Sequence, residues 1–111
     1  SCWDVFAKSN SISNNQKTLT EIIRASYEKL PAIISTGNVW SSLDAKKLLN
    51  QGADLVGVGR VAIAHPNWAN NVSNINYNPS KPPFSVDELK KAKLNKKFIS
   101  YMKNWEGFVK E

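Results

Sequence analysis

The chain has 111 residues, 41% of them hydrophobic, which is enough to form the core of one small domain. It carries 15 Lys and Arg against 9 Asp and Glu, a formal net charge of +6, and no apolar run long enough to span a bilayer. Its single cysteine, Cys2, excludes an internal disulfide, and its single histidine, His65, excludes a histidine-based metal cluster. We therefore expect a cytoplasmic protein that has no membrane partner and binds no metal.

The first 30 residues predict the end of a strand, a polar loop and an amphipathic helix. Residues 1–6 (SCWDVF) are typical of a buried strand that runs into a loop, and residues 8–16 (KSNSISNNQ) are typical of the loop itself. A helix is predicted over 18–30, because apolar residues recur there at helical spacing: Leu19, Ile22, Ile23, Tyr27 and Leu30. Since a strand end without an upstream partner has unpaired edges, we expect the chain to be part of a longer protein.

A strand–helix–strand pattern follows. The β-branched run 32–36 and the run 54–58 predict buried parallel strands. The helix between them is predicted to begin near Ser42, with Ser41 as its N-cap and Asp44 completing a capping box. Three leucines mark its predicted inner face: Leu43, Leu48 and Leu49. This order of elements, with connections so short, predicts a right-handed βαβ unit in a parallel sheet.

Beyond the second strand the sequence predicts short helices. Residues 61–64 and residues 67–72 each indicate a helical turn, and a His-Pro pair at 65–66 separates them. Residues 74–83 are rich in Pro and Asn and predict a loop.

Two further helices are predicted near the C-terminus. Ser85 and Glu88 form a capping box that starts the first of them. The last helix carries an apolar stripe, for which we expect a role in core packing: Phe98, Tyr101, Met102 and Trp105. We divide the chain accordingly into residues 1–73, which hold the βα units, and residues 74–111, a loop and helices that pack on them.

The two predicted strands each end in a glycine, at Gly37-Asn38 and at Gly59-Arg60. Glycine at a strand end lets the backbone approach a ligand without a Cβ in the way. Adjacent parallel strand ends gather backbone N–H groups that can hold a dianion, and Arg60 adds a charged fork for phosphate oxygens. The sequence therefore predicts a phosphate-binding corner at these four residues. The alternative is that both glycines serve turns only and that Arg60 makes a surface ion pair.

The chain resembles the C-terminal quarter of the Old Yellow Enzyme family, the NAD(P)H-dependent flavin oxidoreductases. In this family the seventh strand ends in a small-residue run with Gly-Asn, similar to residues 35–38, and a Gly-Ala-Asp-Leu-Val turn similar to residues 52–56 leads into the eighth. The eighth strand closes on Gly-Arg, similar to residues 59–60. An apolar turn and a segment with Pro and Trp follow, similar to residues 65–68.

Both ends of the chain extend this likeness. Residues 105–109 (WEGFV) are similar to a tail of the bacterial branch, and residues 1–6 resemble the end of the sixth strand. The resemblance implies an α/β fold, the C-terminal part of an FMN-binding TIM (β/α)8 barrel from the end of strand six through helix eight, incomplete as given. It also implies that the FMN phosphate is held by the corner residues Gly37, Asn38, Gly59 and Arg60.

The resemblance further implies the reaction. NADH or NADPH gives a hydride to FMN, and the reduced flavin passes it to a small-molecule electron acceptor. The groups that hold and protonate the acceptor belong to earlier barrel strands, so we expect no catalytic residue in this chain. Alone it would offer a phosphate half-site with no surface to stack the flavin ring, and we expect it to be inactive by itself.

Two other functions stay open. The tRNA dihydrouridine synthases are FMN barrels with a similar Gly…Gly-Arg corner that bind RNA, and the basic run 90–97 (KKAKLNKK) is compatible with such a role. The spacing in residues 64–68 and the C-terminal tail differ from that family, so we do not expect nucleic acid as a partner. The chain could also be a non-catalytic module that only self-associates through strand edges and helix faces. We expect homo-oligomers from the chain alone.

Overall fold

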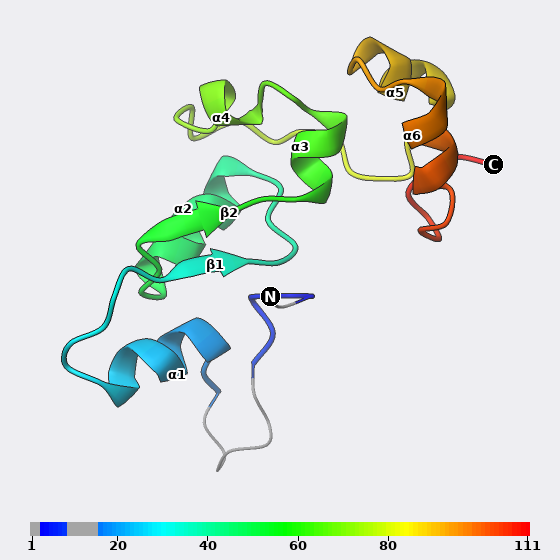
Figure 1. The fold of residues 1–111 in the computed structure, drawn as a ribbon. Helices are drawn as coiled ribbons and strands as arrows, with labels where there is room; N and C mark the ends of the chain where they lie inside the picture. The colour runs from blue at the N-terminus through cyan, green and yellow to red at the C-terminus, as the bar shows by residue number, and fades with distance from the viewer. Residues whose placement is uncertain (1–2, 9–15) are drawn as a thin grey trace.

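The computed structural model describes residues 3–8 and 16–111, which form two strands and six helices in a body of 47 × 30 × 23 Å (Figure 1). In chain order the elements are α1 (Leu19–Ser26), β1 (Ile34–Thr36), α2 (Ser42–Asn50), β2 (Leu55–Gly57), α3 (Arg60–Ala64), α4 (Trp68–Asn71), α5 (Val86–Lys91) and α6 (Lys96–Met102). None of the helices formed by these residues is long and apolar enough to cross a membrane. The predictions for Ser1, Cys2 and residues 9–15 lie outside the described residues.

The two strands form a parallel pair that α2 connects. The opposed residues are Ile34 and Leu55, Ser35 and Val56, and Thr36 and Gly57. This confirms the predicted parallel arrangement, although the ladder spans only three pairs and each strand is shorter than expected. The predicted burial of the strands is wrong, since Ser35 is their only buried residue and Ile34 and Leu55 are exposed. The side chain of Thr36 lies against Gly57, where a Cβ would lie 1.9 Å from Thr36 Oγ1. A strand followed by a helix is the repeat from which (β/α)8 barrels are built, and this βαβ unit holds one such repeat and the strand after it. The barrel itself stays a prediction.

Helix α2 begins at the predicted capping box. The Ser41 hydroxyl accepts the Asp44 N–H at 3.1 Å, and Asp44 Oδ2 accepts the Ser41 N–H at 2.9 Å. Leu48 is fully buried, as predicted, but Leu43 is 62% exposed and Leu49 is 46% exposed. The inner-face prediction for these two leucines is wrong. The buried residues of α2 are Ser42, Ala45 and Leu48, at the spacing i, i+3, i+6. Leu43 and Leu49 each follow one of these residues directly, so their side chains point about 100° away from the buried face.

Helix α1 is shorter than the predicted 18–30 segment. Its N-terminus has a capping box between Thr18 and Glu21. It ends at Ser26, because Tyr27 is extended with φ −141° and ψ 141°. The only fully buried residue of α1 is Thr20, whose hydroxyl shares a 2.8 Å hydrogen bond with Ser35 of β1.

The N-terminal residues 3–6 do not form the predicted strand end. Asp4 Oδ1 accepts the Phe6 N–H at 3.0 Å, and the Asp4 carbonyl accepts the Ala7 N–H at 3.2 Å, so the side chain and backbone of Asp4 close a turn. Val5 is nevertheless buried, and its N–H donates to the Gly37 carbonyl at 3.2 Å. Among the described residues, one backbone hydrogen bond and no ladder therefore joins this segment to the end of β1.

A charged contact ties α1 to the turn before β2. The Arg24 guanidinium forms an ion pair with Asp54, and Arg24 Nε–H donates to the Gly52 carbonyl over 2.8 Å. Asp54 Oδ2 also accepts the Ile33 N–H at 2.8 Å. The hydrogen bond from Ile33, and after it the hydrogen bond from Arg24, lowers the pKa of the Asp54 carboxyl.

We expect this contact to make the fold less stable in acid. The pKa of Asp54 is lower in the folded chain than in the unfolded chain, where it is about 3.9. Its stabilising contribution is therefore complete above that value and is lost as the pH falls through the folded pKa. Urea unfolding measures the free energy of unfolding between about pH 5 and pH 2. In Asp54→Asn this free energy should decrease less steeply as the pH is lowered. The substitution should not abolish the decrease, because the Ser85 backbone N–H also lowers the pKa of Glu88. An unchanged slope would contradict the prediction.

The second half of the chain consists of short helices joined by turns. The predicted helical turns at 61–64 and 67–72 correspond to α3 and α4. The predicted capping box of α5 is present, since Ser85 Oγ accepts the Glu88 N–H at 3.1 Å and Glu88 Oε2 accepts the Ser85 N–H at 2.6 Å. Helix α5 follows its sequence signal closely because its cap is a local interaction.

One cluster of buried side chains runs through both halves of the chain. Its members come from the N-terminal turn, the strand ends, the helices and the C-terminal tail: Val5, Val39, Trp40, Ala45, Leu48, Ala53, Val61, Trp68, Phe84, Leu89, Ile99, Met102, Phe108 and Val109. The tail is held by backbone hydrogen bonds from the Phe84 N–H to the Phe108 carbonyl (2.8 Å) and from the Lys110 N–H to the Phe84 carbonyl (2.7 Å).

The predicted packing role of the C-terminal aromatic stripe is wrong for three of its four residues. Met102 is buried, but Phe98, Tyr101 and Trp105 are 39%, 54% and 46% exposed. Helix α6 ends at Met102, so Trp105 lies in the turn that follows. Ile99 and Met102 set the buried face of this short helix, which leaves Phe98 and Tyr101 to one side of it.

Candidate functional site

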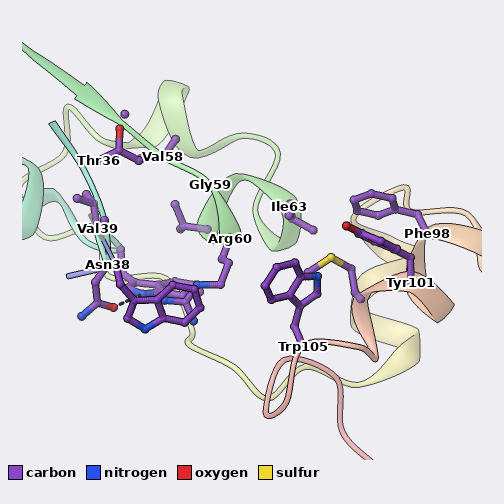
Figure 2. A pocket seen from close by; sticks show the side chains of 16 residues that line it. Thr36, Asn38, Val39, Val58, Gly59, Arg60, Ile63, Phe98, Tyr101 and Trp105 are labelled. Atoms are coloured by element: carbon purple, nitrogen blue, oxygen red, sulfur yellow. Dashed lines mark hydrogen bonds between the residues drawn. The ribbon is translucent and has the colours of Figure 1, made fainter. Parts of the chain in front are cut away.

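All four residues of the predicted phosphate corner line one pocket of about 370 Å3. The ends of β1 and β2 and the start of α3 form one side, and α6 with the turn after it forms the other. Figure 2 shows Asn38, Gly59 and Arg60 on the first side and Phe98, Tyr101 and Trp105 on the second. The topology accounts for this placement, since parallel strands present their C-terminal ends at the same edge.

The end of β1 turns sharply through two residues of positive φ. Gly37 has φ 144° and Asn38 has φ 58°, a left-handed conformation that Gly and Asn adopt more readily than other residues. The Asn38 side chain is held in place, because its Oδ1 accepts the indole N–H of Trp40 at 3.1 Å. This leaves the amide N–H groups of Asn38 as the donors that the side chain can offer to a ligand.

The end of β2 passes directly into α3 through Gly59. Gly59 is the N-cap of α3 and supplies no side-chain hydrogen bond to the first turn. Its carbonyl accepts the N–H groups of Ala62 and Ile63 at 3.0 and 3.3 Å. A Cβ built on Gly59 meets no atom within 4 Å, so the glycine leaves open space at the pocket. This fits a position where a ligand approaches the backbone closely.

Arg60 brings positive charge to the pocket without a carboxylate partner. Across residues 3–8 and 16–111 it forms no ion pair; its guanidinium instead lies over the rings of Trp3 and Trp40, 5.1 and 5.8 Å from their centroids. Contacts of this kind orient a guanidinium while its N–H groups stay available for an anion. The alternative in which Arg60 serves a surface ion pair is therefore wrong for the described residues.

Trp40 links the two strand ends, and the sequence reasoning missed it. It is only 3% exposed, and its ring contacts Asn38 through the indole N–H and Arg60 through its face. Its own backbone is fixed on both sides, since Asp44 Oδ2 accepts its N–H at 3.0 Å and its carbonyl accepts the Trp68 indole N–H at 2.8 Å. The sequence signal for it is its position two residues after Asn38, between the predicted strand end and the Ser41 cap of the next helix.

The aromatic side of the pocket was also missed as a site. Phe98 and Tyr101 contact one another, with ring centroids 5.9 Å apart and planes inclined by 33°. Both line the pocket with Trp105 and with Ile63 of α3. The helical spacing of Phe98, Tyr101 and Trp105 is the same for a core face and for a pocket-lining face, so the sequence carries no signal that separates the two.

A metal site is not formed by the described residues, where no three or more His, Cys, Asp or Glu side chains are grouped suitably. His65 is engaged elsewhere: its Nε2–H donates to the Ser80 carbonyl at 2.8 Å, and its ring meets Phe84 edge-on at 5.7 Å.

Comparison of the chain with protein-family models, with curated proteins and with solved structures finds no match. The residues themselves fit a phosphate group on three counts. The turn at Gly37-Asn38 brings backbone to the pocket, Gly59 leaves space beside it, and Arg60 supplies a guanidinium that forms no ion pair with the part of the chain that the structure describes.

Proposed function

We propose that the chain supplies the FMN phosphate site of a flavin-dependent NAD(P)H oxidoreductase of the Old Yellow Enzyme type. One observation carries the proposal: two parallel strand ends bring Gly37, Asn38, Gly59 and Arg60 into a single pocket. Two strand-end glycines followed by an amide and a cation are suited to a phosphate dianion. The resemblance of residues 35–38, 52–56 and 59–60 to the family's last two strands supports the same assignment.

In this proposal each corner residue has a separate part. Gly37 and Gly59 allow the backbone to approach the phosphate oxygens. Asn38 offers its side-chain amide, and Arg60 offers two parallel N–H donors to two oxygens. The flavin supplies the hydride chemistry when it is bound, with NADH or NADPH as donor, and the chain anchors it by its phosphate.

The proposal has consequences for partners and location. The hydride acceptor is a small electron-poor molecule, and a cytoplasmic location agrees with a single cysteine in the sequence. Self-association of the chain is also part of the proposal. It is supported by Ile34 and Leu55, which face one another across the ladder and are 65% and 53% exposed.

The proposal is tested by Arg60→Ala in the 111-residue chain. Hydrogen bonds to charged groups contribute strongly to the free energy of binding. Removal of the guanidinium should therefore weaken FMN binding by about 10- to 100-fold. Binding is measured by the quenching of flavin fluorescence on titration with protein. Riboflavin has no phosphate, so its affinity should not change in Arg60→Ala.

Lys97→Ala is the matched control, because it removes one positive charge from an exposed α6 residue that does not line the pocket. It should bind FMN like the unmodified chain. If Arg60→Ala, like Lys97→Ala, retained the full FMN affinity, the phosphate assignment would be refuted.

A further inference from the structure

Three large aromatic side chains stand at the surface of the C-terminal segment. Phe98, Tyr101 and Trp105 lie within one segment of eight residues, and each of their side chains is more than a third exposed. Isolated exposed aromatic residues are ordinary, but a group that faces a concave surface is typical of a binding site. Here all three line the pocket that contains Arg60.

Packing within the described residues does not account for these side chains. Helix α6 is attached to the core by Ile99 and Met102, which are 4% and 3% exposed. Phe98 and Tyr101 contact each other's rings, and neither belongs to the buried cluster. The helix would therefore keep its core contacts if either ring were removed.

The aromatic residues face the charged side of the pocket. Figure 2 shows Tyr101 and Trp105 extending from the C-terminal segment toward the side of the pocket that Ile63 and Arg60 form. The pocket therefore has a cationic end at Arg60 and an uncharged aromatic end at Tyr101 and Trp105. A ligand that complements both ends carries an anionic group on one side and a flat, uncharged ring system on the other.

We propose that Tyr101 and Trp105 form a stacking subsite for the planar ring of the ligand whose phosphate Arg60 binds. The inference rests on the proposed function for the phosphate end and adds a second, separate contact for the ring. It differs from the expectation that the chain has no surface for a flavin ring. With this subsite the chain binds FMN through both of its ends.

The experiment measures the affinities of FMN and riboflavin by flavin fluorescence for the unmodified full chain and for its Tyr101→Ala, Trp105→Ala and Arg60→Ala variants, to which a conservative variant and a control are added. Loss of a stacking ring should weaken the binding of FMN and of riboflavin equally, by about tenfold or more. Arg60→Ala should weaken the binding of FMN alone. Trp105→Phe keeps a ring and should recover most of the riboflavin affinity.

Tyr27→Ala is the matched control, since Tyr27 is 68% exposed, follows α1 and does not line the pocket. It should leave both affinities unchanged, and circular dichroism establishes that each variant is folded. Unchanged affinities in both Tyr101→Ala and Trp105→Ala, beside weaker FMN binding in Arg60→Ala, would overturn the ring subsite and leave the phosphate site in place. Weaker binding of both ligands in the aromatic variants with no effect of Arg60→Ala would overturn the phosphate site alone. A chain that binds neither ligand would overturn both.

Discussion

Replacement of Trp40 by Ala is expected to lower the free energy of unfolding by about 3–5 kcal/mol, as for other large aromatic residues removed from a core. Trp40 is 3% exposed, so truncation leaves a cavity that the surrounding side chains cannot fill completely. It also removes the ring contact with Phe84, at 6.3 Å between centroids, and the indole hydrogen bond to Asn38. Urea unfolding followed by circular dichroism measures the loss.

Two further variants separate the fold from the site at this position. Trp105→Ala removes an exposed tryptophan and should change the free energy of unfolding by less than about 1 kcal/mol. Trp40→Phe keeps most of the ring but removes the N–H that Asn38 accepts. It should be folded and should bind FMN several-fold more weakly. If Trp40→Ala unfolded at the same urea concentration as the unmodified chain, the position of Trp40 in the core would be wrong.

Replacement of Phe108 by Ala is expected to lower the free energy of unfolding by a similar amount, about 3–5 kcal/mol. Phe108 is 2% exposed, and its ring meets Phe84 edge-on with 5.3 Å between centroids, an arrangement that adds to the stabilisation from burial. The residue also anchors the C-terminal tail, because its carbonyl accepts the Phe84 N–H. The midpoint of thermal unfolding, recorded by circular dichroism, measures the effect.

Phe98→Ala provides the comparison for this variant. Phe98 is in the same C-terminal region and is 39% exposed, so its removal should lower the midpoint far less than Phe108→Ala. Equal shifts for the two variants would mean that the tail contributes to stability no more than the surface of α6 does.

Elements whose signals are local could be predicted from the sequence. The capping boxes at Ser41 and Ser85 begin α2 and α5 because the side chain and the backbone groups it binds lie three residues apart. The parallel pair and the meeting of Gly37-Asn38 with Gly59-Arg60 also followed, since a short βαβ unit has few possible arrangements.

Features that depend on distant contacts could not be predicted in this way. The ring of Trp40 joins Asn38 to Arg60 only because the fold brings 38–40 and residue 60 together, and no periodicity marks such a contact. The stripe of α6 has helical spacing, yet spacing alone does not say which side of a short helix faces the core. Residues 3–6 form a turn instead of the predicted strand end, because Asp4 accepts hydrogen bonds from the backbone N–H groups of Phe6 and Ala7.

The two sides of the pocket differ in how freely they can change during evolution or engineering. On the strand side, Trp40 belongs to the core as well as to the corner, so a substitution that reshapes the corner also removes part of the stability that keeps the chain folded. On the helix side, Tyr101 and Trp105 are exposed and can be exchanged with little loss of folding free energy. New ligand preferences would therefore arise first through Tyr101 of α6 and Trp105 of the turn that follows it, while the strand-end corner stays as it is.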